Sequence, residues 1–436
     1  MNIGLTSEYF FPFAPGGAEW STLFLAQRLA KAHRVVVITP NYGAAPHEEK
    51  DGIIIERFAF PFKLGRGQRL VPYGYLSNPL FYAYSALQIA RQVKKHRLDI
   101  LHAHNKQVLV GTVVAAKATG VPAVVSLRDY MVLCRYGMCL NAFDTHPDGC
   151  HLASYRQCVR DYLALYMPDI GAWRRTLVYA GAGYHRLDTM LKRAVLGRAD
   201  AAVTTSRKMR HIYLSRGLDP LRTLAIHNPL PEAPVLSPPS EGHQSGFHIL
   251  YAGKLSWGKG PHLLVEALPA IRRAVAPEPV SVTLAGQGPL RAHLEQRVDT
   301  LGLADIVTFA GQLPYHILQG LYVQADVVVV PSVWQEPFGR VALEALMCGT
   351  PVVASNRGGL GEIVQDGITG FIVEPKPKPI ADAVVHVLQL STFRLQVRDA
   401  LPSLRRRFGS DIVRLHMELY NRLLSGRPLE LPLPGE

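Results

Sequence analysis

Two glutamates follow one predicted strand at a spacing that suits hydroxyl binding. The apolar run Asp326–Pro331 precedes a Pro- and Gly-containing turn with Glu336, and Glu344 lies about one turn into the helical stretch that follows. Both carboxylates could face a ligand above that helix and accept hydrogen bonds from vicinal hydroxyls, as sugars carry. Amides of the Pro337–Val341 turn would point at an anion. Ordinary surface glutamates remain the alternative, because they are common.

A second group of residues suits phosphate. Gly253–Pro261 follows the apolar run Ile249–Ala252 and contains two lysines, Lys254 and Lys259. Its glycines allow close backbone approach, and Pro261 suits the first position of a helix. Compact positive charges in this position could neutralise a diphosphate leaving group, and such electrostatic stabilisation is often the largest catalytic contribution.

The glycine pair Gly16 and Gly17 lies behind the first apolar run, Ile3–Thr6, and opens a helix that we expect to continue through Leu29. A helix start of this kind is a further anion-binding position. The pair is not the dinucleotide fingerprint G-x-G-x-x-G, and no acidic residue lies at the expected distance on a second strand. Hydride transfer is therefore disfavoured.

Two histidines share one face of the predicted strand Ile100–His104 because side chains alternate along a strand. His102 lies deeper in the strand, and we interpret it as a hydrogen-bonded core residue. His104 lies at the carboxyl end, where ligands of parallel sheets bind, and is a candidate site residue, with a hydrogen-bonded core histidine as the alternative.

The cysteines are clustered, with the spacing Cys134-x4-Cys139-x10-Cys150-x7-Cys158 and with His146 and His151 among them. The pattern contains no Cys-x2-Cys pair, so we favour packed thiols over a bound metal or iron–sulfur cluster, which remains the alternative. Cys348 is interpreted as a small helix-packing residue.

Strand-length apolar runs alternate with amphipathic stretches of helical length, which is typical of βα units and parallel sheets. We therefore predict an α/β protein of two doubly wound domains that face a central cleft. The predicted strands of the first domain are Ile3–Thr6, Val35–Thr39, Ile53–Arg57, Ile100–His104, Ala123–Leu127, Ala201–Thr205 and Thr223–Ile226. Those of the second are Ile249–Ala252, Val280–Ala285, Val307–Ala310, Val327–Val330, Val352–Ala354 and Phe371–Val373.

Breaks in this alternation predict the domain boundaries. The first domain spans residues 1–230 and includes a helical insertion over about 128–200, which is rich in aromatic residues and arginine. A Pro-rich linker follows at 231–246, and the second domain covers 247–408. Residues 409–436 form a C-terminal packing helix, Asp411–Leu424, and a tail.

Basic residues are distributed unevenly. The net charge is +13, and residues 1–232 carry all of this excess, because basic and acidic residues are equal in number beyond them. Arg57–Arg97 contains eight basic residues and no acidic one, and Arg156–Arg216 contains twelve against four. Such patches favour nucleic acid, anionic lipid or a phosphate-bearing acceptor, although a solvated face is the alternative.

Hydrophobic residues make up 48% of the 436-residue chain, which excludes intrinsic disorder. No apolar window approaches the ~18–20 residues that a membrane span needs. The first residues run straight into a predicted strand without a signal-peptide pattern. We therefore expect a cytoplasmic protein that is soluble or lies peripherally on the inner face of the cytoplasmic membrane.

Taken together, these residues resemble the retaining glycosyltransferases of the GT-B architecture, specifically family 4, over nearly the whole chain. Glu336 to Glu344 matches the family's E-x7-E pattern. The other matching segments are Ala345–Val353, Gly358–Gly359 with Glu362, Gly253–Leu255 with Lys259–Gly260, Ala285–Leu290, Gly16–Gly17 and His102–His104.

The resemblance implies roles for individual residues. Glu344 would bind the donor ribose, Glu336 the donor sugar hydroxyls, and Lys254 and Lys259 the diphosphate. Gly16, Gly17 and His104 would approach from the acceptor side, the glycines adding to donor binding, and His104 would orient sugar hydroxyls. The segment Gly311–Leu313 would meet the base through its backbone, and the remaining donor-binding positions are Phe338, Gly339 and Val341.

Asp129, in Leu127–Tyr130, resembles a stretch of bacterial polysaccharide-building members. Arg128 stands where those members usually have His, so both positions are candidate acceptor-side residues only. The resemblance further implies a nucleotide-diphosphate sugar as co-substrate, a glycan or lipid-diphosphate acceptor, and transfer in surface polysaccharide or lipopolysaccharide synthesis.

The chain contains no Asp-x-Asp pair, which argues against the metal-dependent GT-A class, and we expect no cofactor and no divalent metal. The bond to the diphosphate would break through an oxocarbenium-like state. Two alternatives stay open: a sugar-nucleotide isomerase or epimerase on the same fold, and a nucleic-acid-binding protein. The sequence does not specify the sugar, base, acceptor, linkage or oligomeric state.

Overall fold

The computed structural model describes residues 1–14, 16–65, 70–138, 150–168, 170–230, 246–390 and 392–431. It divides the chain into two compact units. Unit 1 comprises residues 1–135, 180–232 and 407–436, and unit 2 comprises 136–179 and 233–406. The predicted linker at 231–246 lies outside the described residues except for Gly246.

Unit 1 is built on a sheet in the order β3-β4-β2-β1-β5-β6-β7-β8, counted over the described residues. All neighbours are parallel except β3 and β4. Its strands are β1 (Asn2–Ser7), β2 (Arg34–Pro40), β3 (His47–Lys50), β4 (Ile53–Phe58), β5 (Ile100–His104), β6 (Ala123–Leu127), β7 (Ala201–Thr204) and β8 (Thr223–Ala225). The central strands β5 and β6 are buried at every position, and their sequences are apolar except for His102, His104 and Ser126.

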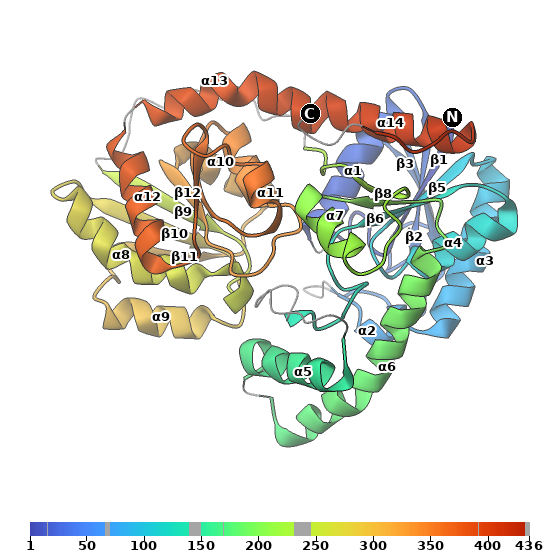
Figure 1. Cartoon of the computed structure of the whole chain (residues 1–436), viewed down its shortest axis with the longest axis horizontal. Coiled ribbons are helices and arrows are strands. Elements are labelled where there is room, and N and C mark those ends of the chain that lie inside the picture. The colour runs from blue at the N-terminus through green and yellow to red at the C-terminus, as the bar shows by residue number, and fades with distance from the viewer. Residues whose placement is uncertain are drawn as a thin grey trace. The chain divides into compact units, whose positions relative to one another are not determined.

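Helices flank this sheet as the alternation predicts. They are α1 (Gly17–Ala30), α2 (Tyr73–Leu76), α3 (Pro79–His96), α4 (Leu109–Thr119), α7 (Arg207–Leu214) and α14 (Asp411–Leu424). The predicted helix at the C-terminus has the bounds of α14, which packs against α1 (Figure 1). Its residues Ile412, Leu415 and Leu419 join one apolar core with Ile3, Leu5 and other side chains of the sheet.

Unit 2 contains a fully parallel sheet in the order β11-β10-β9-β12-β13-β14, counted over the described residues. Its strands are β9 (Phe247–Ala252), β10 (Val280–Ala285), β11 (Val307–Gly311), β12 (Val327–Val330), β13 (Val352–Ser355) and β14 (Gly370–Val373). Its helices are α8 (Pro261–Val275), α9 (Arg291–Thr300), α10 (Tyr315–Gln324), α11 (Arg340–Met347), α12 (Pro377–Gln389) and α13 (Phe393–Arg405).

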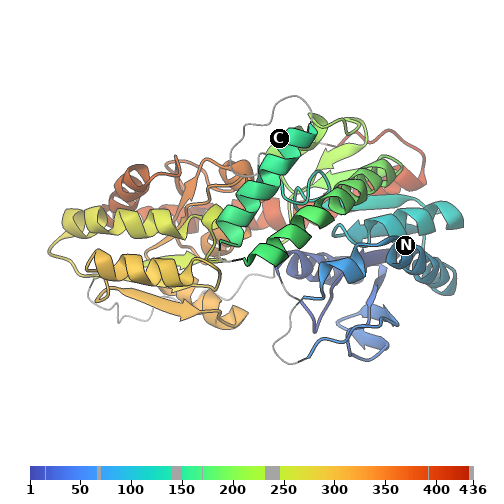
Figure 2. The same ribbon diagram turned by 90° about the horizontal axis from the view of Figure 1, so that it is seen from below.

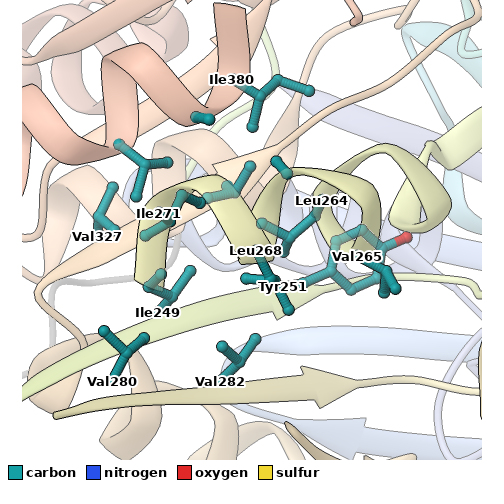
Figure 3. Packing of buried hydrophobic residues seen from close by; sticks show 14 of the residues in the cluster. Ile249, Tyr251, Leu264, Val265, Leu268, Ile271, Val280, Val282, Val327 and Ile380 are labelled. Atoms are coloured by element: carbon teal, nitrogen blue, oxygen red, sulfur yellow. The ribbon is translucent and has the colours of Figure 1, made fainter. Parts of the chain in front are cut away.

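The core of unit 2 lies between this sheet and helix α8. Leu264, Leu268 and Ile271 from the helix meet Ile249 and Val282 from the strands, as Figure 3 shows. Pro261 begins α8 directly after Gly260, whose φ of 70° is left-handed. The predicted strands are all present, and their close-packed apolar cluster fixes the loops that follow them.

Two differences from the sequence predictions stand out. The antiparallel edge strand β3 was not predicted, because its sequence His-Glu-Glu-Lys is polar and exposed. The predicted insertion at 128–200 contains the helices α5 (Leu152–Tyr166) and α6 (Ala172–Leu196), shown in green in Figures 1 and 2. Residues 136–179 of this segment group with unit 2 rather than unit 1.

Candidate functional site

Glu336 lies on the loop that follows β12 and is only 5% exposed. Three donors of the described residues converge on its Oε1 atom. Ser332 Oγ donates at 2.6 Å, Lys259 Nζ at 2.5 Å and Trp334 Nε1 at 3.3 Å. The structure therefore joins two of the predicted site residues, Glu336 and Lys259, in one hydrogen-bonded ion pair.

The charge state of Glu336 follows from these contacts. Burial acts to raise the pKa of its carboxyl group, but the charge of Lys259 and the three hydrogen bonds outweigh burial and hold the pKa below its ordinary value. Glu336 is thus ionised at neutral pH. An ionised carboxylate only accepts hydrogen bonds, so this group can bind ligand hydroxyls that act as donors.

Lys259 reaches Glu336 because the loop after β9 packs closely against the loop after β12. Lys259 ends a short 3-10 turn, Trp257–Lys259, directly before Gly260. A side chain on Gly260 would place its Cβ 1.9 Å from the carbonyl oxygen of Pro331 at the end of β12. The ammonium of Lys259 also lies 5.2 Å from the ring centroid of Trp334. The β9 and β12 loops therefore touch only because residue 260 is glycine.

Tyr166, the last residue of helix α5, lies near the ring of Trp334. The rings of Tyr166 and Trp334 lie 6.5 Å apart, between centroids. A Cβ on Gly258 would lie 2.5 Å from the Tyr166 hydroxyl oxygen and 2.9 Å from the Trp334 ring. The insertion was predicted only to be rich in aromatic residues, and the contact of Tyr166 with this loop was not predicted.

Glu344 occupies a separate buried position on α11. It is 6% exposed, forms an ion pair with Arg340 one turn earlier, and accepts a hydrogen bond from the Tyr322 hydroxyl at 3.3 Å. Arg340 was not among the predicted site residues, although its i, i+4 spacing to Glu344 is a signal for such a pair. Gly339 precedes the helix with a φ of 109°, and a Cβ there would lie 2.6 Å from Leu360.

Other predicted donor-binding residues have different surroundings. Phe338 is buried, whereas Val341 is half-buried. Lys254 is exposed and makes no hydrogen bond to Glu336 or Glu344. Gly311 ends β11 in the left-handed region, and Leu313 is half-buried.

The loop that carries Lys254 is tied to the loop after β10. The Leu255 amide donates to the Gln287 carbonyl at 3.0 Å, and the Leu290 amide donates to the Leu255 carbonyl at 3.0 Å. A Cβ on Gly286 would lie 1.8 Å from the Gly253 carbonyl oxygen. The glycines at 253 and 286 thus let two backbones meet next to Lys254.

In unit 1, predicted site residues lie at the carboxyl ends of β5 and β6. An Arg128 nitrogen donates to His104 Nδ1 at 2.7 Å, and a second one binds the Asn228 side chain. Arginine only donates, so Nδ1 of His104 must accept and the neutral ring carries its proton on Nε2. Burial, aided by the neighbouring His102 and Arg128 charges, holds the pKa of His104 well below its ordinary value. His104 is fully buried, and its Nε2 has no hydrogen-bond partner among the described residues.

His102 has partners on both ring nitrogens. Tyr420 OH lies 2.6 Å from Nδ1, and Ser126 Oγ lies 2.8 Å from Nε2. Tyr420 comes from α14, so the C-terminal helix reaches the strand that carries His104.

Several polar residues around these strand ends were not selected from the sequence. Lys106 Nζ pairs with Asp129 at 2.6 Å, and Asn105 Nδ2 donates to Glu19 at 3.1 Å. Glu19 also accepts from the Gly16 amide at 3.0 Å, at the start of α1 where Gly17 is the first residue. Glu8 accepts from the Gln107 amide at 2.9 Å. The sequence could have indicated these residues by their position, because each follows the carboxyl end of a predicted strand or lies at the start of the next helix.

The cysteine cluster shows no metal site in the described part of the chain. Cys134 and Cys158 are buried, Cys150 is exposed, and Cys139 and His146 lie outside the described residues. Among the residues described, no three His, Cys, Asp or Glu side chains are grouped so as to hold a metal ion. Burial raises the pKa of the Cys348 thiol to about 12, consistent with an unreactive packed thiol.

Membrane spans are likewise absent from the described helices. None of them combines the length and the apolar character that crossing a bilayer would require.

Comparison with known families extends these observations. Residues 15–233 match the family described as Glycosyltransferase Family 4, and residues 238–402 match Glycosyl transferases group 1. The first match covers half of the chain, and the chain therefore belongs to Glycosyltransferase Family 4.

Individual relatives match over shorter stretches. The D-inositol 3-phosphate glycosyltransferase of Paenarthrobacter aurescens is 41% identical over 141 residues, which are 32% of this chain and 34% of that protein. The glycogen synthase of Mycobacterium tuberculosis is 40% identical over 141 residues, 32% of this chain and 33% of that protein. The matched part thus spans about a third of the length of these curated relatives.

A solved structure matches almost the whole chain. The Anabaena protein HepE, crystallised with UDP and glucose, has a TM-score of 0.64 at 22% identity, over 96% of this chain and 98% of that one. The fold is therefore the predicted GT-B architecture of two α/β domains with parallel sheets.

Proposed function

We propose that this protein is a retaining glycosyltransferase that moves a sugar from a nucleotide-diphosphate sugar to a glycan or lipid-linked acceptor. The observation that carries the proposal is the ion pair of the buried Glu336, which follows β12, with the half-buried Lys259, which follows β9. Membership of Glycosyltransferase Family 4 supports it, as do relatives named for glycosyl transfer and glycogen synthesis.

The donor would be held by groups of unit 2. The Glu336 carboxylate would accept hydrogen bonds from the sugar hydroxyls, and Glu344 would accept those of the ribose. Lys259, with Lys254 and the amides at the start of α11, would hold the diphosphate. Each group already lies at the end of a strand or the start of a helix, so little reorganisation is needed when charge develops.

In the proposed reaction, the bond from the sugar C1 atom to the diphosphate oxygen breaks, and the acceptor oxygen bonds to C1 on the same face. The acceptor hydroxyl proton passes to the departing phosphate oxygen. Negative charge grows on the diphosphate as the bond breaks, where Lys259 and Lys254 would stabilise it. We propose that these cations take the part of a divalent metal, so that no metal is required.

We further place this transfer in surface polysaccharide or lipopolysaccharide synthesis, at the inner face of the cytoplasmic membrane. The concentration of positive charge in residues 1–232 supports an acceptor that bears phosphate or lies at an anionic surface.

The test is nucleotide release from a panel of UDP- and GDP-sugars in the presence of a membrane extract. We expect one donor to be consumed, and Lys259→Ala and Glu344→Ala each to lower the rate at least about a hundredfold. The exposed ion pair of Arg272 and Asp305, 2.8 Å apart, supplies control variants that should keep full activity, because Asp305 precedes β11 at the amino edge of the sheet.

Two outcomes would contradict the assignment. If the Lys259→Ala and Glu344→Ala variants released nucleotide at the unmodified rate, the proposed donor site would be wrong. Conversion of the donor to an isomer without any acceptor would indicate an isomerase or epimerase instead.

A further inference from the structure

Helix α6 exposes an apolar band in its second half. Tyr184, Leu187 and Leu191 follow one another at i, i+3 and i+7 and therefore share one face of the helix. Leu187 is 66% exposed, and Met190 beside it is 57% exposed. Exposed apolar side chains that gather on one face mark an interaction surface.

The buried face of the same helix segment is firmly anchored. Lys192 and Asp188 form an ion pair of 2.8 Å that is almost completely buried. Lys192 also donates to Gln107 at 2.6 Å, and Asp188 accepts from Ser77 at 2.6 Å. The helix therefore cannot rotate its apolar band inward without breaking this buried network.

Positive charge lines the apolar band. Arg186 and Arg193 are seven residues apart, so they lie along the same edge of α6. Asp188, the one acidic residue of this helix, is buried, and the described exposed face of α6 thus carries no negative charge. This is the pattern of helices that lie in a membrane interface.

A cavity of about 490 Å³ adjoins this edge in unit 1. Met190 and Arg193 from α6 line it together with Arg216 and Arg222, and an Arg193 nitrogen donates to the Arg216 carbonyl at 2.8 Å. Asp219 also lines the cavity, 3.6 Å from Arg222, so the three arginines leave a net positive charge.

The location of the cavity separates it from the candidate site. Its lining includes Ala202 and Thr223, near the amino ends of β7 and β8. Asp129 and His104 instead lie at the carboxyl ends of the parallel strands. The two positions therefore lie at opposite edges of the same sheet.

We propose that the α6 band and the adjoining cavity form a docking surface for anionic phospholipid. Leu187, Met190 and Leu191 enter the membrane interface, while Arg193, Arg216 and Arg222 bind headgroup phosphates. This inference rests on the proposed function only in that docking would bring the enzyme to a lipid-linked acceptor. A two-fold contact with a second copy would bring like-charged arginine edges together, which disfavours that occupant.

The experiment is co-sedimentation of the whole protein with two kinds of vesicle: phosphatidylcholine alone, and phosphatidylcholine mixed with phosphatidylglycerol. We expect binding to the mixed vesicles only. Arg193→Gln should weaken it about fivefold, the effect of one interfacial charge, and Leu187→Glu about tenfold or more. The controls are Arg273→Gln on α8 and Leu395→Glu on α13, where Leu395 is 58% exposed.

Equal binding to both vesicles, or full binding by Leu187→Glu, would overturn the proposal. If, without vesicles, the sedimentation coefficient of Leu187→Glu differed from that of the unmodified protein, the apolar band would be a contact between copies of the chain, and the proposal would be overturned. Nucleotide release without vesicles is measured in parallel. If it persists while vesicle binding is absent in the unmodified protein, the docking surface fails and the proposed function stands.

Discussion

Burial at the end of β1 raises the pKa of Glu8 to about 7, although Lys106 opposes the shift. The protonated form is thus stabilised in the folded chain relative to the unfolded chain. Between pH 4.5 and about 7 the folded chain holds a proton that the unfolded chain has lost. The contribution of Glu8 to stability therefore falls as the pH rises through this window and is constant above it.

We predict that Glu8→Gln removes this fall. We compare the free energy of unfolding of the variant with that of the unmodified protein at each pH. This difference should be roughly 1–3 kcal/mol more in favour of the variant at pH 8 than at pH 5. Urea unfolding at the two pH values measures the difference. If the variant and the unmodified protein differed in stability by the same amount at both pH values, ionisation of Glu8 would not destabilise the folded chain.

Individual residues differ in how far the sequence revealed them. Glu336 and Lys259 were predicted, since each follows an apolar strand within a Gly-rich turn. Arg340 and Glu8 were not, because the i, i+4 spacing of Arg340 to Glu344 and the position of Glu8 after a strand are common and do not reveal burial. Their surroundings arise from burial and from partners on other elements, which only the folded chain brings together.

At the scale of elements, the loops after β9 and β12 depend on one glycine. Gly260 combines a φ of 70° with a Cβ position 1.9 Å from the Pro331 carbonyl oxygen. Gly302 has a similar φ of 64°, but nothing lies within 4 Å of its Cβ position. Substitution of Gly302 would therefore cause backbone strain alone, whereas substitution of Gly260 would cause both backbone strain and a steric clash.

We predict that Gly302→Ala costs about 1 kcal/mol through strain alone. Gly260→Ala should cost about 3 kcal/mol or more, because the backbone must also shift away from Pro331. Denaturant unfolding of both variants measures these costs. Equal costs would mean that the close contact at Gly260 relaxes freely.

The strands were predictable where burial requires apolar residues, as in β12. The edge strand β3 was not, since a charged sequence at a sheet edge protects against wrong pairing and resembles a loop. The grouping of residues 136–179 with unit 2 could not be predicted from the sequence either. It depends on distant contacts, such as that of Tyr166 with Trp334, which leave no periodic signal.

At the scale of the molecule, unit 1 is completed by the end of the chain. Leu419 of α14 is fully buried in the core that contains Ile3 and Leu5, whereas Leu424 on the same helix is 45% exposed. The helix therefore belongs to the hydrophobic core of a sheet whose first strand is formed by the first residues of the chain.

We predict that Leu419→Ala destabilises unit 1 by about 2–5 kcal/mol, since it opens a cavity in this core. Leu424→Ala should change stability by less than about 0.5 kcal/mol. Scanning calorimetry should show a lower transition temperature for the first variant only. Similar transition temperatures for both variants would place α14 outside the cooperative core.

The interleaving of the two units constrains folding during synthesis. The chain passes between them four times, and residues 407–436 return to unit 1 after unit 2 has been made. At about 5–20 residues per second, a ribosome needs roughly 10–40 s for the residues between 232 and 407. During that interval, the apolar surface later covered by α14 stays uncovered on the nascent chain. The part of the protein that emerges first is thus completed last, and a chaperone that shields this surface should raise the yield of folded protein.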